Sequence, residues 1–94
     1  MTEDPKFIFR VHAMQRMFER GISELDIRLV VEDARVVEDY PTEQPFPMKL
    51  LLGWSDRRPV HVLACFDVQA DTIIIVTVYE PTLERWLPGF LKRR

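Results

Sequence analysis

Three side chains suited to holding an anion or moving a proton recur every four residues near the N-terminus: His12, Arg16 and Arg20. In a helix of 3.6 residues per turn, side chains four residues apart differ by about 40° in direction, so these three would form one inclined ridge. Arginine offers two parallel hydrogen bonds to a phosphate, and histidine titrates near neutral pH. The ridge is a candidate phosphate-binding surface. The alternative interpretation is a solvated polar face paired with Glu19 and Glu24.

The second histidine, His61, stands in a strand-like segment whose other residues are almost all apolar. A three-residue hairpin loop, Gln69 to Asp71, would place His61 opposite Tyr79 and Leu63 opposite Thr77, which gathers His61, Thr77 and Tyr79 on one face. A four-residue loop would shift the pairing and separate them. The sequence does not choose between these registers. A histidine that only hydrogen-bonds within the sheet rim is the alternative interpretation.

The sequence does not indicate a metal or a nucleotide cofactor. The two histidines fall on different predicted elements without a closely spaced third ligand. The single cysteine, Cys65, lies in an apolar strand pattern typical of a buried thiol, so an intrachain disulfide and a cysteine-based zinc site are excluded. The three glycines are too far apart to form a phosphate-binding loop. We therefore expect chemistry without a metal or cofactor.

Helical periodicity marks a first helix from Val11 to Arg20, ended by Gly21. Its apolar residues recur at spacings of three and four, which predicts one buried face formed by Ala13, Met14, Met17 and Phe18.

A second helix is predicted to follow at once. Ser23 is suited to the N-cap, and Asp26 takes the place of the usual glutamate or glutamine of a capping box. We expect this helix to run to about Asp33, with Leu25 and Leu29 facing the core together with Ile22 or Val30.

Beyond Ala34 the pattern is that of strands. A proline-spaced connection between Pro41 and Pro47 interrupts them, because proline can neither continue a helix nor pair within a central strand. Whether Phe7 to Phe9 form a first strand or an apolar lead into the helix is left open. The predicted strands cover residues 35–40, 48–54, 60–68 and 72–79, and a short helical turn is expected over residues 83–87.

Helices followed by strands with local pairing predict an α+β fold, in which two N-terminal helices pack on a mostly antiparallel sheet of about four strands. With 94 residues, 47% of them hydrophobic, the chain is expected to form a single domain over residues 1–94, with a core at 6–90 and a mobile basic tail at 91–94. No apolar run approaches the roughly 20 residues of a membrane helix, and the first residues are polar, so we expect a cytoplasmic protein with no membrane association.

Several motifs together resemble a small bacterial family of domains of unknown function. They are H-A-M-Q-R-M-F-E-R-G-I-S at 12–23, Y-P-x-x-x-P-x-P at 40–47, L-L-L-G at 50–53, P-V-H-V at 59–62 and T-V-Y-E-P at 77–81. That family is similar to the RelE/ParE and BrnT-like toxins of toxin–antitoxin systems, which are compact α+β proteins. Its members are often found beside a small zinc-ribbon protein like those that act as antitoxins. The resemblance therefore implies a RelE/ParE-like fold, with RNA or the ribosome as target and a zinc-ribbon protein as partner.

The resemblance also implies an activity, that of a metal-independent endoribonuclease (an mRNA interferase) that forms a 2′,3′-cyclic phosphate. Such chemistry needs a base for the ribose 2′-hydroxyl, cations for the phosphorane and an acid for the 5′-oxygen. On the motif positions, His12 or His61 would be base or acid, Arg16 and Arg20 would hold the phosphate, and Tyr79 would orient or donate a proton.

This chain departs from those toxins in its charge. They are generally basic, whereas this chain has a formal net charge of −2 and a pI near 5.6. Without a global positive field, a ribosome-bound or protein-bound target is favoured over free RNA. The competing interpretations are a non-catalytic protein-interaction module on the same fold and a structural or regulatory dimer.

Overall fold

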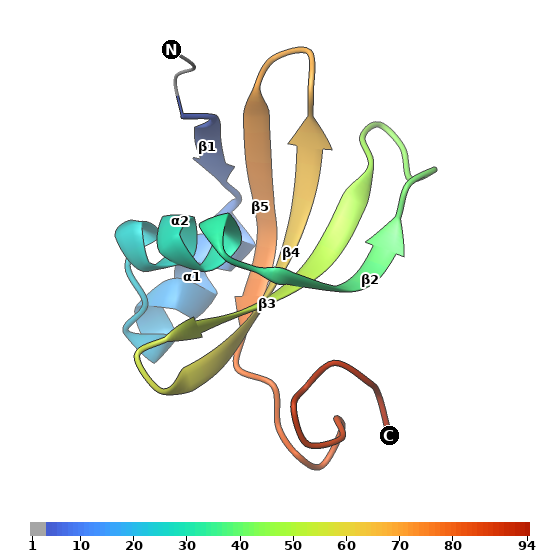
Figure 1. Cartoon of the computed structure of the whole chain (residues 1–94). Helices are drawn as coiled ribbons and strands as arrows, with labels where there is room; N and C mark the ends of the chain where they lie inside the picture. The colour runs from blue at the N-terminus through green and yellow to red at the C-terminus, as the bar shows by residue number, and fades with distance from the viewer. Residues whose placement is uncertain (1–3) are drawn as a thin grey trace.

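The computed structural model describes residues 4–94, so residues 1–3 of the expected domain lie outside the described part. Two helices and five strands follow one another along the chain (Figure 1). In chain order they are β1 (Lys6–Phe9), α1 (Val11–Arg20), α2 (Glu24–Glu32), β2 (Arg35–Tyr40), β3 (Met48–Ser55), β4 (Arg58–Asp67) and β5 (Thr72–Tyr79).

The five strands form one mixed sheet in the order β1-β5-β4-β3-β2. Strands β2 to β5 pair antiparallel with their chain neighbours, while β1 pairs parallel with β5, with Lys6 opposite Thr72. The α+β class and the mostly antiparallel sheet agree with expectation, but the expected count of about four strands is wrong. The fifth strand is β1, whose partner lies far away in the sequence, and no local pattern announces such a parallel pairing.

The expected helical turn near the C-terminus is also wrong. Backbone hydrogen bonds from Arg85 and Trp86 to the carbonyl of Thr82 make an isolated turn, and Trp86 then pairs with Arg93 in an antiparallel bridge. One turn fixes many dihedral angles for very few hydrogen bonds, and Pro88 prevents its extension. The last residues are not a free tail, because the backbone amide of Leu87 donates to the carbonyl of Lys92.

Both helices lie against the same face of the sheet, α1 over β5 and α2 over β3 (Figure 1). The core between the two layers is built from Ala13, Met17, Ile22, Ile27, Val30, Leu51, Val60, Val62, Ala64, Ile75 and Val78. We call the opposite side of the sheet, where the chain after β5 returns, the open face.

The helices are turned differently from the prediction. On α2 the buried residues are Ile27 and Val30, which confirms the inward placement of Val30, whereas Leu25 and Leu29 are exposed. On α1 only Ala13 and Met17 are buried, so Met14 and Phe18 do not face the core as expected. Apolar residues occupy two sides of each helix, and spacing alone cannot tell which side meets the sheet. The helix layer therefore carries uncovered apolar side chains.

The predicted helix boundary signals are confirmed. The Ser23 hydroxyl accepts a hydrogen bond from the Asp26 amide at 3.0 Å, and the Asp26 carboxylate accepts one from the Ser23 amide at 2.9 Å, which completes the capping box. Gly21 ends α1 with φ of 65°, a left-handed conformation that glycine adopts without steric cost. Neither of the helices in the described range is long and apolar enough to cross a membrane.

Candidate functional site

The open face carries a buried histidine with both ring nitrogens engaged. His61 alternates along β4 with Val60 and Val62, which face the helices, so its ring points to the open face. Its side chain is 0% exposed. Nε2 lies 2.9 Å from the carbonyl oxygen of Phe90, and Nδ1 lies 3.0 Å from the hydroxyl of Tyr79.

These two partners fix the tautomer of His61. The carbonyl of Phe90 can only accept, so Nε2 carries the ring proton and donates it there. Nδ1 of the neutral ring then has a free lone pair, and the Tyr79 hydroxyl must donate to it. The edge-on ring of Trp86, at 4.4 Å between centroids, closes the imidazole off from solvent. The Tyr79 proton is thereby aimed at His61, and the lone pairs of its oxygen remain free.

The register that joins His61 to Tyr79 arises in an unexpected way. The hairpin loop has four residues, 68–71, and this loop was expected to separate the two side chains. A bulge opposite Leu63 and Ala64 leaves Val76 without a partner and restores the pairing of His61 with Tyr79 and of Leu63 with Thr77. His61, Thr77 and Tyr79 therefore share one face, as predicted for the shorter loop.

Tyr79 forms part of the wall of a pocket of about 370 Å³ on the open face. Leu50 and Leu63 give it an apolar floor, and Glu38 and Tyr40 of β2 stand on the opposite wall. We call it the Tyr79 pocket; its lining consists of Glu38, Tyr40, Glu43, Met48, Leu50, Leu63, Thr77, Tyr79 and Arg93. An apolar floor with a few converging polar groups is the usual composition of a small-ligand site.

Arg93 brings a positive charge to this lining and is held in a fixed orientation. It donates from Nε and Nη2 to the two carboxylate oxygens of Glu38, at 2.8 and 3.1 Å, and the Tyr40 hydroxyl donates to the same carboxylate. The Arg93 guanidinium also lies 4.6 Å from the centroid of the Trp86 ring. Two of the five guanidinium hydrogens are used by Glu38, so three remain for a ligand.

Hydrogen bonds and burial shift the pKa values of Glu38, His61 and Tyr79. Hydrogen bonds from Arg93 and then Tyr40 lower the pKa of Glu38 to about 2, so its carboxylate is always ionised near neutral pH. Burial lowers the pKa of His61 below its usual value and raises the pKa of Tyr79. The His61–Tyr79 pair is therefore neutral at rest.

The N-terminal candidates lie elsewhere. His12, Arg16 and Arg20 are exposed on α1, in the layer that covers the other face of the sheet. Arg16 makes a loose contact of 3.9 Å with Glu19, and the Arg20 carbonyl accepts a hydrogen bond from Arg58. The structure thus brings His61 and Tyr79 together and leaves these three residues apart from them.

Sequence reasoning missed Glu38, and it placed Arg93 only in the basic tail at 91–94. One signal was present for the first: Glu38 and Tyr40 are two residues apart on a strand and so share a face. No signal placed Arg93 in this pocket, because its position depends on the return of the C-terminal segment over the sheet.

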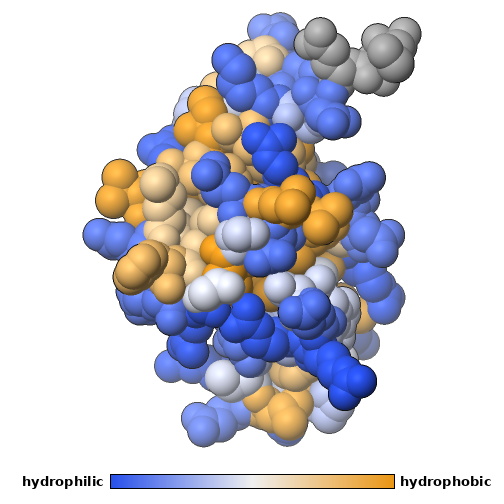
Figure 2. All heavy atoms as spheres, turned by 90° about the vertical axis from the view of Figure 1, so that its left-hand side faces the viewer, coloured by the Kyte–Doolittle hydropathy of each residue, from blue (hydrophilic) through white to orange (hydrophobic). Residues whose placement is uncertain are grey.

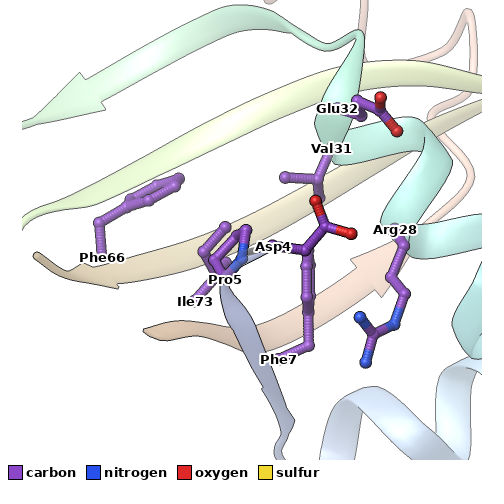
Figure 3. A pocket seen from close by; sticks show the side chains of 8 residues that line it. All are labelled: Asp4, Pro5, Phe7, Arg28, Val31, Glu32, Phe66 and Ile73. Carbon is purple, nitrogen blue, oxygen red and sulfur yellow. The ribbon is translucent and has the colours of Figure 1, made fainter. Parts of the chain in front are cut away.

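A second pocket, of about 400 Å³, lies at the other end of the sheet between β1 and α2 (Figure 3). Phe7, Phe66 and Ile73 give it an apolar wall, and the Arg28 guanidinium lies 4.8 Å from the Phe7 ring. Figure 3 shows the Asp4 carboxylate turned toward the end of α2. Its described lining contains no histidine, tyrosine or hydroxyl group for proton transfer. The Tyr79 pocket is therefore the better candidate for chemistry.

Within residues 4–94, no group of three or more histidine, cysteine, aspartate or glutamate side chains is placed to hold a metal ion. The fold and pocket define an α+β domain with a buried histidine hydrogen-bonded to a half-buried tyrosine. Residues 9–80 match the family described as "Domain of unknown function (DUF4258)", and because the match covers well over half of the chain, the chain belongs to that family. No curated protein and no solved structure matches it.

Proposed function

We propose that the chain is a metal-independent endoribonuclease that cleaves RNA in the Tyr79 pocket. The observation that carries the proposal is the hydrogen bond between Tyr79 and the buried, neutral His61 at 3.0 Å, beside the fixed cation of Arg93. The resemblance to RelE/ParE and BrnT-like toxins supports the reaction class. The pocket supplies a proton acceptor and a phosphate-binding group in one place.

The proposed base is Tyr79 backed by His61. As the 2′-oxygen attacks phosphorus, the 2′-hydroxyl proton passes to the Tyr79 oxygen while the Tyr79 proton passes to Nδ1 of His61. The new bond joins the 2′-oxygen to phosphorus, the bond from phosphorus to the 5′-oxygen breaks, and the leaving oxygen takes a proton from water at the open mouth. The products are a 2′,3′-cyclic phosphate and a 5′-hydroxyl, and His61 returns its proton to solvent through Tyr79.

Arg93 is the proposed phosphate-binding residue. Its three remaining hydrogens can donate to the non-bridging oxygens, where negative charge grows in the transition state. Glu38 and Trp86 hold the guanidinium plane, so little order must be gained when the phosphate binds. This assignment moves the phosphate-binding role from Arg16 and Arg20, implied by the motifs, to the C-terminal segment.

The charge of the pocket indicates how RNA would reach it. Glu38 and Glu43 outnumber Arg93 in its lining, and the whole chain is acidic. Long-range attraction for a free RNA backbone is therefore weak. We propose that the substrate is presented by the ribosome or another protein, and that a zinc-ribbon antitoxin is the inhibitory partner.

The test is cleavage of free RNA and of mRNA on translating ribosomes, with detection of 2′,3′-cyclic phosphate ends. We expect Tyr79→Phe to reduce the rate roughly 100-fold or more, the usual contribution of a positioned acid–base group. Arg93→Ala should have a comparable effect, while Arg57→Ala, which removes an exposed arginine in the turn between β3 and β4, is the charge-matched control and should cleave normally. Thermal unfolding confirms that each variant is folded.

Two results would contradict the proposal. One is a wild-type protein that cleaves neither substrate, and the other is a folded Tyr79→Phe variant that cleaves at the wild-type rate. Growth inhibition on expression, relieved by co-expression of an adjacent zinc-ribbon gene, tests the partner separately. The second candidate function is a protein-interaction module, favoured by the exposed apolar side chains of the helix layer.

A further inference from the structure

The outer side of α1 carries an apolar stripe that the fold leaves uncovered. Val11, Met14 and Phe18 are 71%, 52% and 88% exposed. With about 100° per residue, these three side chains fall within an arc of about 60° on the helix. Together with Gln15 and Glu19 they line a shallow groove. Figure 2, which looks onto the side of the molecule with β1 and the helices, shows apolar groups breaking the hydrophilic surface.

Exposing three adjoining large apolar side chains to water is energetically unfavourable. Phe18 in particular has almost its whole ring in solvent. Exposed apolar residues scattered singly are normal, but a stripe with helical spacing is the pattern of a helix that packs against another helix. The stripe therefore indicates a surface that is covered in the working protein.

The polar residues beside the stripe suggest what covers it. Gln15 and Glu19 flank it on one side, followed around the helix by His12. If two copies of α1 pack antiparallel about a two-fold axis, the same flank of both helices comes together. Val11 of each copy then meets Phe18 of the other, the two Met14 side chains meet near the axis, and Glu19 lies beside His12 of the second copy. The face is complementary to itself.

We infer that the chain forms a symmetric dimer through the outer face of α1. The contact is isologous, so each complementary pair occurs twice. Its area is limited, since three side chains and their neighbours supply less than the roughly 800 Å² per partner of a stable complex. We therefore expect association in the micromolar range. Because the Tyr79 pocket lies on the open face, away from the helix layer, both pockets stay accessible in the dimer.

The test is the molar mass in solution between about 1 and 500 μM, on the order of the affinity expected for a small interface, by sedimentation or light scattering. The wild-type protein should pass from monomer to dimer across this range. Phe18→Ser should shift the midpoint at least tenfold to higher concentration. Val68→Ser is the matched control, because Val68 is 83% exposed in the hairpin loop away from α1, and it should dimerise like the wild type.

A charge exchange tests the orientation. Glu19→Lys removes the carboxylate beside His12, and His12→Glu brings two carboxylates together, so each change alone should weaken the dimer. The double variant should recover it, because a lysine and a glutamate would then face each other across the contact. A wild-type chain that stays monomeric to the highest concentration would overturn the inference and leave the stripe to a different protein. A dimer that Phe18→Ser leaves intact, or a double variant that shows no recovery, would overturn it as well. None of these measurements depends on ribonuclease activity.

Discussion

His61 and Tyr79 face each other on antiparallel strands, with Nδ1 of the histidine 3.0 Å from the tyrosine hydroxyl. The pairing needs two irregularities at once. Compared with a three-residue loop, the four-residue loop shifts the pairing of β5 with β4 by one residue. The bulge at Val76 cancels this shift between the loop and Tyr79. Deep in the sheet beyond that bulge, the imidazole gains two hydrogen bonds and loses its contact with water.

The first prediction concerns the pH dependence of stability. The pKa of His61 is lowered in the folded chain by burial, so the unfolded chain binds more protons as the pH falls below about 6.5. Stability should be level above that pH and should decline as the pH falls toward about 5. Urea unfolding across this range, from mildly alkaline to mildly acidic pH, measures the decline.

The variant His61→Gln provides the comparison. It should be less stable than the wild type by about 1–3 kcal/mol at mildly alkaline pH, because one of the two hydrogen-bond partners is left unsatisfied. Its further loss on acidification should be smaller than that of the wild type. His12 is present in both proteins and cancels in the difference. Parallel pH profiles for the two proteins would show that His61 is not held neutral by the fold.

The second prediction concerns the ion pair that fastens the C-terminal segment. Glu38→Gln should cost on the order of 1 kcal/mol near neutral pH, a modest value because the Arg93 side chain is largely exposed. The pKa of Glu38 is about 2 in the folded chain against 4.5 ordinarily, so this stabilisation is present above about pH 4.5 and is lost as the pH falls toward 2.

A double-mutant cycle with Glu38→Gln and Arg93→Ala measures that pair. The coupling energy at neutral pH should shrink at about pH 3, and Arg57→Ala in place of Arg93→Ala should show no coupling. Equal coupling energies at both pH values would mean that the carboxylate charge does not stabilise the contact.

Local patterns predicted the parts of this fold that depend on near neighbours. The helix α1, the N-cap at Ser23 and the strands β2 and β5 follow from spacing, capping chemistry and β-branched runs, all of which act within a few residues. The same patterns placed His12, Arg16 and Arg20 along one helix. They could not show that this helix lies across the sheet from His61.

The parts of the fold and of the site that local patterns did not predict depend on contacts between distant segments. Strand β1 pairs with β5 across most of the chain, and Phe90 and Arg93 reach the site only because the last segment turns back over the open face. Helix α2 has two apolar faces. The face with the β-branched Ile27 and Val30 is buried against the sheet, and the face with Leu25 and Leu29 is exposed. Such choices are made by packing against the sheet, which sequence spacing does not encode.

The third prediction concerns the start of α2. Ser23→Ala removes the hydroxyl that accepts from the Asp26 amide and should lower the free energy of unfolding by about 1 kcal/mol. Thr42→Ala, in the exposed connection between β2 and β3, is the control and should change it by less than about 0.5 kcal/mol. Chemical denaturation measures both. A Ser23→Ala variant as stable as the control would show that the capping box contributes nothing.

The fourth prediction concerns the close approach of β3 to α2 at Gly53. A Cβ atom there would lie 2.5 Å from Cγ1 of Val30 and 3.0 Å from the Val30 carbonyl oxygen. Gly53→Ala should therefore cost about 1–3 kcal/mol, the usual cost of overpacking. Val30→Ala alone should also destabilise, because it removes methyl groups from the core.

Combining the two substitutions separates the steric clash from other causes. Val30→Ala removes Cγ1 but leaves the carbonyl, so the double variant should be destabilised by clearly less than the sum of the single changes. Gly21→Ala is the matched control: its Cβ meets nothing within 4 Å, and its cost of about 1 kcal/mol comes from a φ of 65°. That cost should add to the cost of Val30→Ala without coupling. Additive costs for Gly53→Ala would mean that α2 does not approach β3 closely enough to exclude a side chain there.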